Sequence, residues 1–316
     1  MRLGGFFPPA PQGGVAPILQ AEAALGCRLD PVMWFRSWDD TPAGRFRPEQ
    51  LAGLEDRDVV ITWEPWRPAD GKVQPGYAPA AIAAGRHDRY VRDWAQAVRD
   101  TGRVIHLRPM HEMNGTWYPW GSPDGPSCPA DYLAAWRHIR ALFAAEGAGN
   151  VRWIWSPNGA DVPAGNRLED YYPGDDQVDV LGCSAYNWGT TQPWSRWTSF
   201  RDLMAVPYRR LAALGPQPIW LCETGCTPRG GSKPAWVRGM FASAAAFPRL
   251  DAVLWFNIDK ETDWRATEPA KVAAAFRAAG AAGAAGAAGA PADGPAPAGE
   301  PAPGRFWSRR FRAWLD

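Results

Sequence analysis

Apolar runs separated by longer mixed segments recur along most of the chain. Within a run such as Val59-Val60-Ile61, hydrophobic residues follow one another instead of alternating with polar ones. This pattern is typical of parallel strands that are buried on both faces of a sheet. It predicts eight strands, at residues 3–7, 31–38, 58–66, 103–111, 151–157, 178–186, 218–223 and 250–257.

The segments between these runs carry apolar residues at helical spacing. Over residues 129–146, for example, Tyr132, Trp136 and Ile139 recur at intervals of four and three, which places them on one face of a helix. Strands alternating with helices over roughly 250 residues predict an α/β fold of the (β/α)8 TIM barrel type, which we place at residues 1–279. A doubly wound open sheet is the alternative, although no glycine fingerprint for a dinucleotide follows the first strand.

The composition then changes to little but Ala, Gly and Pro, which predicts a flexible linker over residues 280–304. The final segment, 305–316, mixes aromatic residues with arginines. On a helix, Trp307, Phe311 and Trp314 would form one apolar stripe. Two interpretations stay open: a disordered end with chance aromatics, or a short amphipathic segment that binds an anionic membrane surface or a protein partner.

Charge and composition narrow the classes of function. A formal net charge of +1 gives no broad attraction for nucleic acid, and no apolar stretch is long enough to span a bilayer. The chain has 19 tryptophans, several of them just after the apolar runs, and flat aromatic faces suit sugar rings. Its five cysteines include no CxxC pair, so neither a zinc site nor a disulfide framework is indicated. We expect a monomeric enzyme with no nucleic-acid partner.

Carboxylates close two of the predicted strands. Polar residues at the carboxyl ends of barrel strands meet at one rim, and Glu112 and Glu223 should face each other across it. Hydrolysis of a glycosidic bond needs one carboxylic acid to protonate the leaving oxygen and a second carboxylate to attack the anomeric carbon or activate water. The pair predicts glycoside hydrolysis with no metal and no cofactor. His111-Glu112 does not begin an HExxH zinc motif, because Gly115 stands where the second histidine is needed.

The strand ends also carry distinctive segments: RPMHEMNGTWYPWG at 108–121, LCETG at 221–225, ITWEPW at 61–66, and WFN at 255–257 followed by DWR at 263–265. Together they resemble glycoside hydrolase family 26, the β-mannanases and related β-glucanases of the barrel glycosidase clan. The resemblance implies that Glu112 is the acid/base and Glu223 the nucleophile, with retention of configuration through a covalent glycosyl-enzyme. Strand alternation would put His111 and Glu112 on opposite faces, so both can reach a substrate only if the strand ends or bulges there.

The same resemblance and the strand ends provide candidates for sugar binding. Glu64 is either a subsite ligand or a buried partner for an arginine such as Arg36 or Arg108. The substrate-binding candidates are His111, Trp117, Tyr186, Trp255, Trp63, Glu64, Arg108, Asn158 and Trp188.

One position departs from the family pattern. Ser184 stands where the family's mannanases usually carry an acidic residue, which weakens mannan as the substrate. The expected function is that of a retaining endo-β-glycanase acting on β-1,4-mannan, a β-glucan or an exopolysaccharide. The alternative is a weak or inactive glycan-binding barrel in an exopolysaccharide synthesis or export assembly. Such substrates favour an extracellular or envelope location, although the first residues show no secretory signal.

Overall fold

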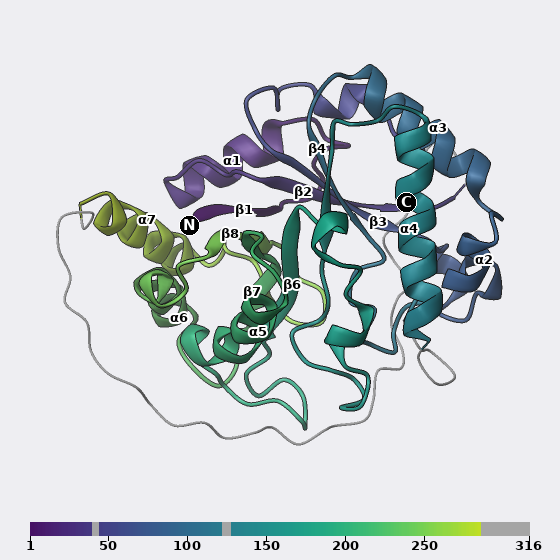
Figure 1. The fold of residues 1–316 in the computed structure, drawn as a ribbon. Coiled ribbons are helices and arrows are strands. Elements are labelled where there is room, and N and C mark those ends of the chain that lie inside the picture. The colour runs from purple at the N-terminus through teal and green to yellow at the C-terminus, as the bar shows by residue number, and fades with distance from the viewer. Residues whose placement is uncertain (40–43, 122–127, 286–316) are drawn as a thin grey trace.

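The computed structural model describes residues 1–39, 44–121 and 128–285, which form a closed barrel of parallel strands (Figure 1). The strands are hydrogen-bonded in sequence order and β8 pairs with β1, which closes the sheet. All eight predicted strands are confirmed, with ends shifted by at most three residues. They are β1 Arg2–Phe6, β2 Val32–Ser37, β3 Val59–Glu64, β4 Ile105–Pro109, β5 Val151–Trp155, β6 Val180–Asn187, β7 Ile219–Cys226 and β8 Leu250–Phe256.

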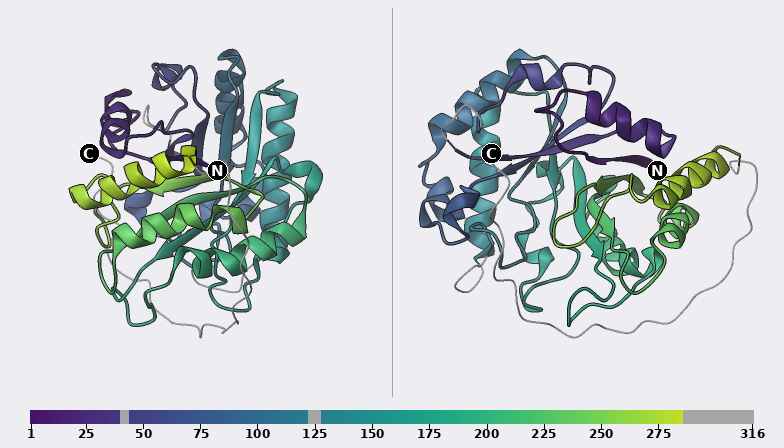
Figure 2. Two further views of the ribbon diagram at one scale, coloured as in Figure 1. Left: turned by 90° about the vertical axis from the view of Figure 1, so that its left-hand side faces the viewer. Right: turned by 180° about the vertical axis from the view of Figure 1, so that it is seen from behind.

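Helices surround the barrel and cover the outward face of its strands (Figure 2). They are α1 Ala16–Leu25, α2 Pro79–Ala83, α3 Asp88–Asp100, α4 Pro129–Ala145, α5 Phe200–Leu214, α6 Lys233–Ala242 and α7 Ala270–Ala285. The expected strict alternation fails in two places. β5 and β6 are joined only by short 3-10 turns, and the described part of the connection between β2 and β3 holds one 3-10 turn and no α-helix. The 3-10 turns lie at Pro48–Leu51, Pro68–Asp70, Pro75–Tyr77, Leu168–Tyr171, Asp175–Gln177 and Ala244–Ala246.

Barrel closure depends on two glycines at the start of the chain. A Cβ on Gly4 would lie 1.9 Å from the carbonyl oxygen of Pro31, and one on Gly5 would lie 2.1 Å from that of Trp255. Gly5 also has a φ of 151°, which side chains disfavour. Larger residues would therefore push β1 away from its neighbours on both sides.

The last helix changes the predicted domain boundary. Helix α7 continues to Ala285, so the linker start placed at residue 280 falls inside a helix. Alanine has the highest helix propensity, and here it outweighs the interspersed glycines. α7 lies beside α1 and α6 (Figure 1). The rest of the predicted linker and the segment 305–316 lie outside the described residues.

Candidate active site

The end of β4 places two adjacent side chains in the barrel mouth. The strand stops at Pro109, and Met110 and Glu112 then adopt positive φ angles of 49° and 55°. Such angles are rare for residues other than glycine and recur where function requires a particular geometry. The Glu112 amide donates to the carbonyl of Ser156 at 2.8 Å, which fixes the turn. The strand therefore ends before His111 and Glu112, which is the condition expected if both side chains are to reach a substrate.

Glu223 enters the mouth from β7. The pairing of β6 with β7 shifts between Cys183 and Ser184, opposite the segment that carries Glu223, and such irregularities redirect side chains. One carboxylate oxygen of Glu223 accepts a hydrogen bond from Arg108, and the other accepts one from the Tyr186 hydroxyl at 2.8 Å. The carboxylate is thus held on both sides.

The two glutamates face each other at short range. One oxygen of Glu112, one oxygen of Glu223 and one ring nitrogen of His111 all lie within 4.8 Å of one another. Carboxyl groups of retaining glycosidases are about 5 to 5.5 Å apart, whereas inverting enzymes hold them about 6.5 to 9.5 Å apart to admit a water. This proximity fits direct attack by one carboxylate.

The surroundings of Glu112 favour the protonated form of its carboxyl group. Burial, followed by the negative charge of Glu223, raises the pKa of Glu112 to about 7. Hydrogen bonds from Ser184 and from Trp117, whose Nε1 lies 2.7 Å from Oε2, oppose that rise. Glu112 is therefore poised to give and take a proton near neutral pH.

Arg108 is the fully buried cation at the floor of the site. Its guanidinium donates to Glu223, to Ser184 Oγ at 2.8 Å and to Thr62 Oγ1 at 3.2 Å. Burial alone would lower the Arg108 pKa, but the charge and hydrogen bond of Glu223, together with Cys222 and Glu112, outweigh burial and the pKa is raised. Glu64 was expected to bind sugar or to pair with an arginine. The guanidinium of Arg108 bonds to Glu223 instead, so Arg108 is not that partner.

His111 and Glu64 form an uncharged pair beside Glu223. Burial and then Arg108 hold the pKa of His111 well below its usual range, so the ring is neutral. Its Nε2 lies 3.1 Å from the Tyr118 hydroxyl, 3.8 Å from Glu223 and 4.0 Å from Glu64. Burial raises the pKa of Glu64 to about 8, so this carboxyl is protonated at neutral pH.

Two predicted sugar contacts are wrong. Trp63 and Trp255 are fully buried and point outward from the barrel. Trp63 packs against Trp94 of α3 and Phe143 of α4, and Trp255 packs against aromatic rings of α6 and α7. Both belong to the layer between strands and helices, because side chains alternate between the two faces of a strand.

The remaining candidates lie at the rim. Trp117, Tyr186 and Trp188 are partly exposed, as a sugar-binding surface requires. Asn158 is also partly exposed, but its amide nitrogen donates to the carbonyl of Ala160 at 2.6 Å. Two neighbours were missed from the sequence. Tyr118, one residue after Trp117, contacts His111, and Trp264 packs against Tyr186 with ring centroids 5.0 Å apart.

The cluster of His111, Glu112 and Glu223 offers the donor types that also bind metal ions. A cation there would approach the guanidinium of Arg108, which already contacts Glu223. Like charges at such range repel strongly in a buried site. A bound metal cation is therefore disfavoured at this cluster.

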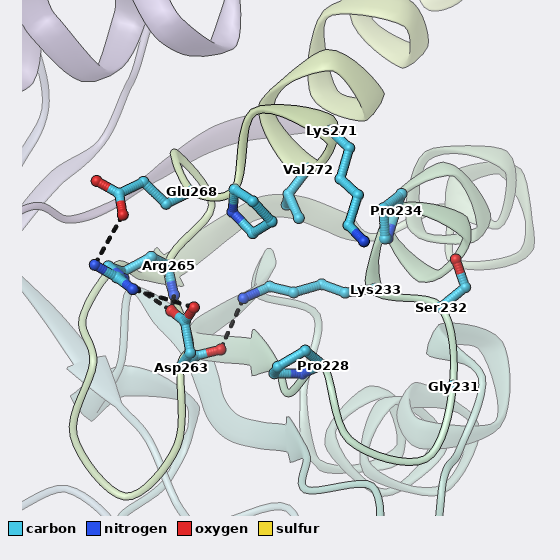
Figure 3. Close-up of a pocket in the computed structure, with 11 residues that line it drawn as sticks. Pro228, Gly231, Ser232, Lys233, Pro234, Asp263, Arg265, Glu268, Lys271 and Val272 are labelled. Atoms are coloured by element: carbon cyan, nitrogen blue, oxygen red, sulfur yellow. Dashed lines mark hydrogen bonds and ion pairs between the residues drawn. The ribbon is translucent and has the colours of Figure 1, made fainter.

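A separate cavity of about 640 Å³ opens beside the ends of β7 and β8, between the first turns of α6 and α7 (Figure 3). Its Lys233 Nζ donates to the backbone carbonyl of Asp263 at 2.8 Å, while the Asp263 carboxylate bonds to Arg265. Burial lowers the pKa of Lys233 to about 8. Its lining residues are not those of the carboxylate cluster.

Comparisons with known proteins agree with this geometry. Residues 85–218 match the model of glycosyl hydrolase family 26. Endoglucanase H of Acetivibrio thermocellus is 37% identical over 259 residues, which cover 80% of this chain and 28% of that protein. A mannan endo-1,4-beta-mannosidase of Bacillus subtilis is 28% identical over 150 residues, covering 45% of this chain and 36% of that protein. The chain thus spans about a third or less of the length of these relatives.

Solved structures share the fold. A GH26 beta-mannanase from Bacteroides ovatus superposes with a TM-score of 0.63 at 17% identity, over 84% of this chain and 82% of that one. A modular endo-beta-1,4-mannanase from Cellulomonas fimi gives 0.61 at 20% identity, over 83% and 65%. A (β/α)8 barrel with two facing glutamates at its carboxyl rim defines the class of barrel glycoside hydrolases. Within that class, the chain belongs to glycosyl hydrolase family 26.

Proposed function

We propose that the protein is a retaining endo-β-glycanase that cleaves a polysaccharide with Glu112 as acid/base and Glu223 as nucleophile. The observation that supports it most directly is the approach of one oxygen from each carboxyl group to within 4.8 Å. Double displacement requires one carboxyl group that donates a proton and a second that attacks, and the raised pKa of Glu112 supports the first role.

In the first step, a Glu223 oxygen bonds to the anomeric carbon while the glycosidic C–O bond breaks and Glu112 gives its proton to the leaving oxygen. Tyr186 and Arg108 orient the attacking carboxylate through their hydrogen bonds. In the second step, Glu112 takes a proton from water, the water oxygen bonds to the anomeric carbon, and Glu223 is released. Two inversions at one carbon give net retention.

We propose a β-glucan, rather than mannan, as the substrate. Endoglucanase H is matched over 80% of this chain, whereas the mannosidase of B. subtilis is matched over 45% at lower identity. Ser184 also binds Arg108 where an acidic side chain is expected in mannanases. The close approach of the two carboxyl groups argues against the alternative of a barrel that only binds glycan.

The test is product analysis on mixed-linkage β-glucan, mannan, glucomannan and a bacterial exopolysaccharide. We expect new reducing ends on the glucan, and proton NMR of the first products should show the β-anomer before mutarotation. Glu223→Gln, which keeps the size of the side chain, is the matched control and should release no products. Cleavage of mannan alone would overturn the substrate assignment, and initial α-anomer would overturn retention.

We also propose that the barrel acts as a monomer and that segment 305–316 attaches it to an anionic membrane surface. Support comes only from sequence: an apolar stripe formed by Trp307, Phe311 and Trp314, with arginines on the other face. The alternative is that the segment binds a protein partner. Light scattering of the purified chain would test the monomer.

A further inference from the structure

Aromatic rings lead outward from the nucleophile along one side of the barrel mouth. The Tyr186 hydroxyl bonds to Glu223, and the Tyr186 ring lies 6.2 Å from that of Trp188. Trp188 in turn meets Trp194 edge to face, with centroids 5.6 Å apart and an interplanar angle of 62°. A continuous aromatic surface therefore connects the catalytic carboxylate with the segment after β6.

The segment that carries Trp194 is held by its own hydrogen bonds. Asn187 Oδ1 accepts from the amides of Gly189 and Thr198, which closes the base of the loop. Ser195, next to Trp194, donates from Oγ to the carbonyl of Gly189 at 2.8 Å. Trp194 is thus presented by an ordered loop, and binding a ligand would not require the loop to order first.

Trp194 is nevertheless exposed. Its side chain is 40% accessible, and among the described residues it is the one aromatic side chain with so large an exposed fraction. An isolated apolar residue on a surface needs no explanation. Here, however, a large ring is fixed in contact with the aromatic wall of the active site, where its free face can cover the apolar face of a sugar ring.

We propose that Trp194 forms a distal subsite, in which its indole stacks on a sugar of a bound β-linked polysaccharide beyond the sugar held at Glu223. The inference rests on the proposed glycanase function and specifies how a long chain is held. Stacking needs no charge, so this subsite would recognise the neutral face of a pyranose. It favours long chains, because a short glycoside bound at the carboxylates does not extend to it.

The test compares kcat/KM for the polysaccharide that the wild type cleaves with kcat/KM for an aryl β-glycoside of the same sugar. For Trp194→Ala we expect the polysaccharide value to fall by about fivefold or more, mainly through KM, because a stacked indole buries a large apolar area. The aryl glycoside value should change far less. Trp194→Phe should restore most of the loss, and Val206→Ala, an exposed apolar truncation on α5, is the matched surface control.

Binding separates this inference from the proposed reaction. Affinity electrophoresis of Glu223→Gln in polysaccharide gels, with and without Trp194→Ala, needs no turnover. Weaker retention of the double variant supports the subsite even if no polysaccharide is hydrolysed. Equal retention, or an equal fall of both kcat/KM values in Trp194→Ala, would overturn it.

Discussion

The indole Nε1 of Trp117 donates a hydrogen bond of 2.7 Å to Oε2 of Glu112, the carboxyl group proposed as the acid/base. The donor stabilises the ionised carboxylate, so it restrains a pKa that burial and Glu223 raise to about 7. Trp117 therefore lowers the pKa of Glu112 as well as lining the rim.

Trp117→Phe should shift the alkaline limb of the pH dependence of kcat/KM upward. Loss of the hydrogen bond disfavours the ionised form, so Glu112 stays protonated to higher pH, by about half a pH unit or more for a bond of ordinary strength. The profile should be measured on an aryl glycoside to limit effects on polysaccharide binding. A downward shift would contradict the donor role of Trp117.

Glu112→Ala should separate substrates by their leaving groups. A polysaccharide needs a proton on its leaving oxygen, and its kcat should fall by about 100-fold or more. A dinitrophenyl glycoside leaves without that proton, so the burst of the first turnover should survive. The matched variant Glu223→Ala removes the nucleophile and should abolish turnover of both substrates. An equal fall in the rate of the first step on the polysaccharide and on the dinitrophenyl glycoside would overturn the acid/base assignment of Glu112.

A chelator should leave activity unchanged. The two carboxylates supply both the proton and the nucleophile, and Arg108 beside Glu223 disfavours a second cation. Initial rates after dialysis against EDTA, with and without added Ca²⁺, Mg²⁺ or Zn²⁺, provide the measurement. Loss of activity on chelation, with recovery of activity on addition of one ion, would indicate that the cluster of His111, Glu112 and Glu223 binds a metal ion.

Vesicle flotation tests segment 305–316. Anionic vesicles should carry the full chain upward and should leave behind a chain truncated after Gly304. A helix of about twelve residues is marginal in water, so we expect this segment to become helical only on the vesicle surface. Neutral vesicles provide the charge control. Equal flotation of the two chains on anionic vesicles would remove the membrane interpretation.

The sequence predicts much of the barrel because its strands are buried on both faces and therefore read as uninterrupted apolar runs. The connections between β2 and β3 and between β5 and β6, which hold 3-10 turns and no described α-helix, were not predicted, since tertiary packing overrides weak helical periodicity. Helix α7 was cut short because an Ala-Gly repeat has the composition of a linker.

The site was predicted unevenly for physical reasons. Glu112 follows the end of β4 and Glu223 lies in the carboxyl half of β7, so the fold brings both to the same rim. Trp63 was wrongly placed among the sugar contacts. It precedes Glu64 on the same strand, and alternation puts the side chains of neighbouring residues on opposite faces. The positive φ at Glu112, which exempts His111 and Glu112 from this rule, depends on contacts such as that with Ser156, which the local sequence does not reveal.

Glu64→Gln should make the folded state more stable than the wild type, by a margin that grows as pH rises. Burial raises the folded-state pKa of Glu64 to about 8, whereas the unfolded chain releases the proton near pH 4.3. Below about pH 4 the group is protonated in both states and contributes no pH dependence. Between these values the folded state retains a proton that the unfolded state has lost, so wild-type stability falls with pH, at most by about 1.4 kcal/mol per pH unit.

Glutamine has nearly the same shape as glutamic acid and no proton to release. The stability of the variant therefore does not fall with pH through this residue. Urea unfolding at pH 4, 5.5 and 7 should give a difference in unfolding free energy between variant and wild type that becomes steadily more favourable to the variant. Glu49→Gln, at an exposed carboxylate that pairs with Arg47, is the matched control and should show no such gain. A Glu64→Gln difference independent of pH would mean that Glu64 ionises freely in the fold, and the neutral pair with His111 would then have to be abandoned.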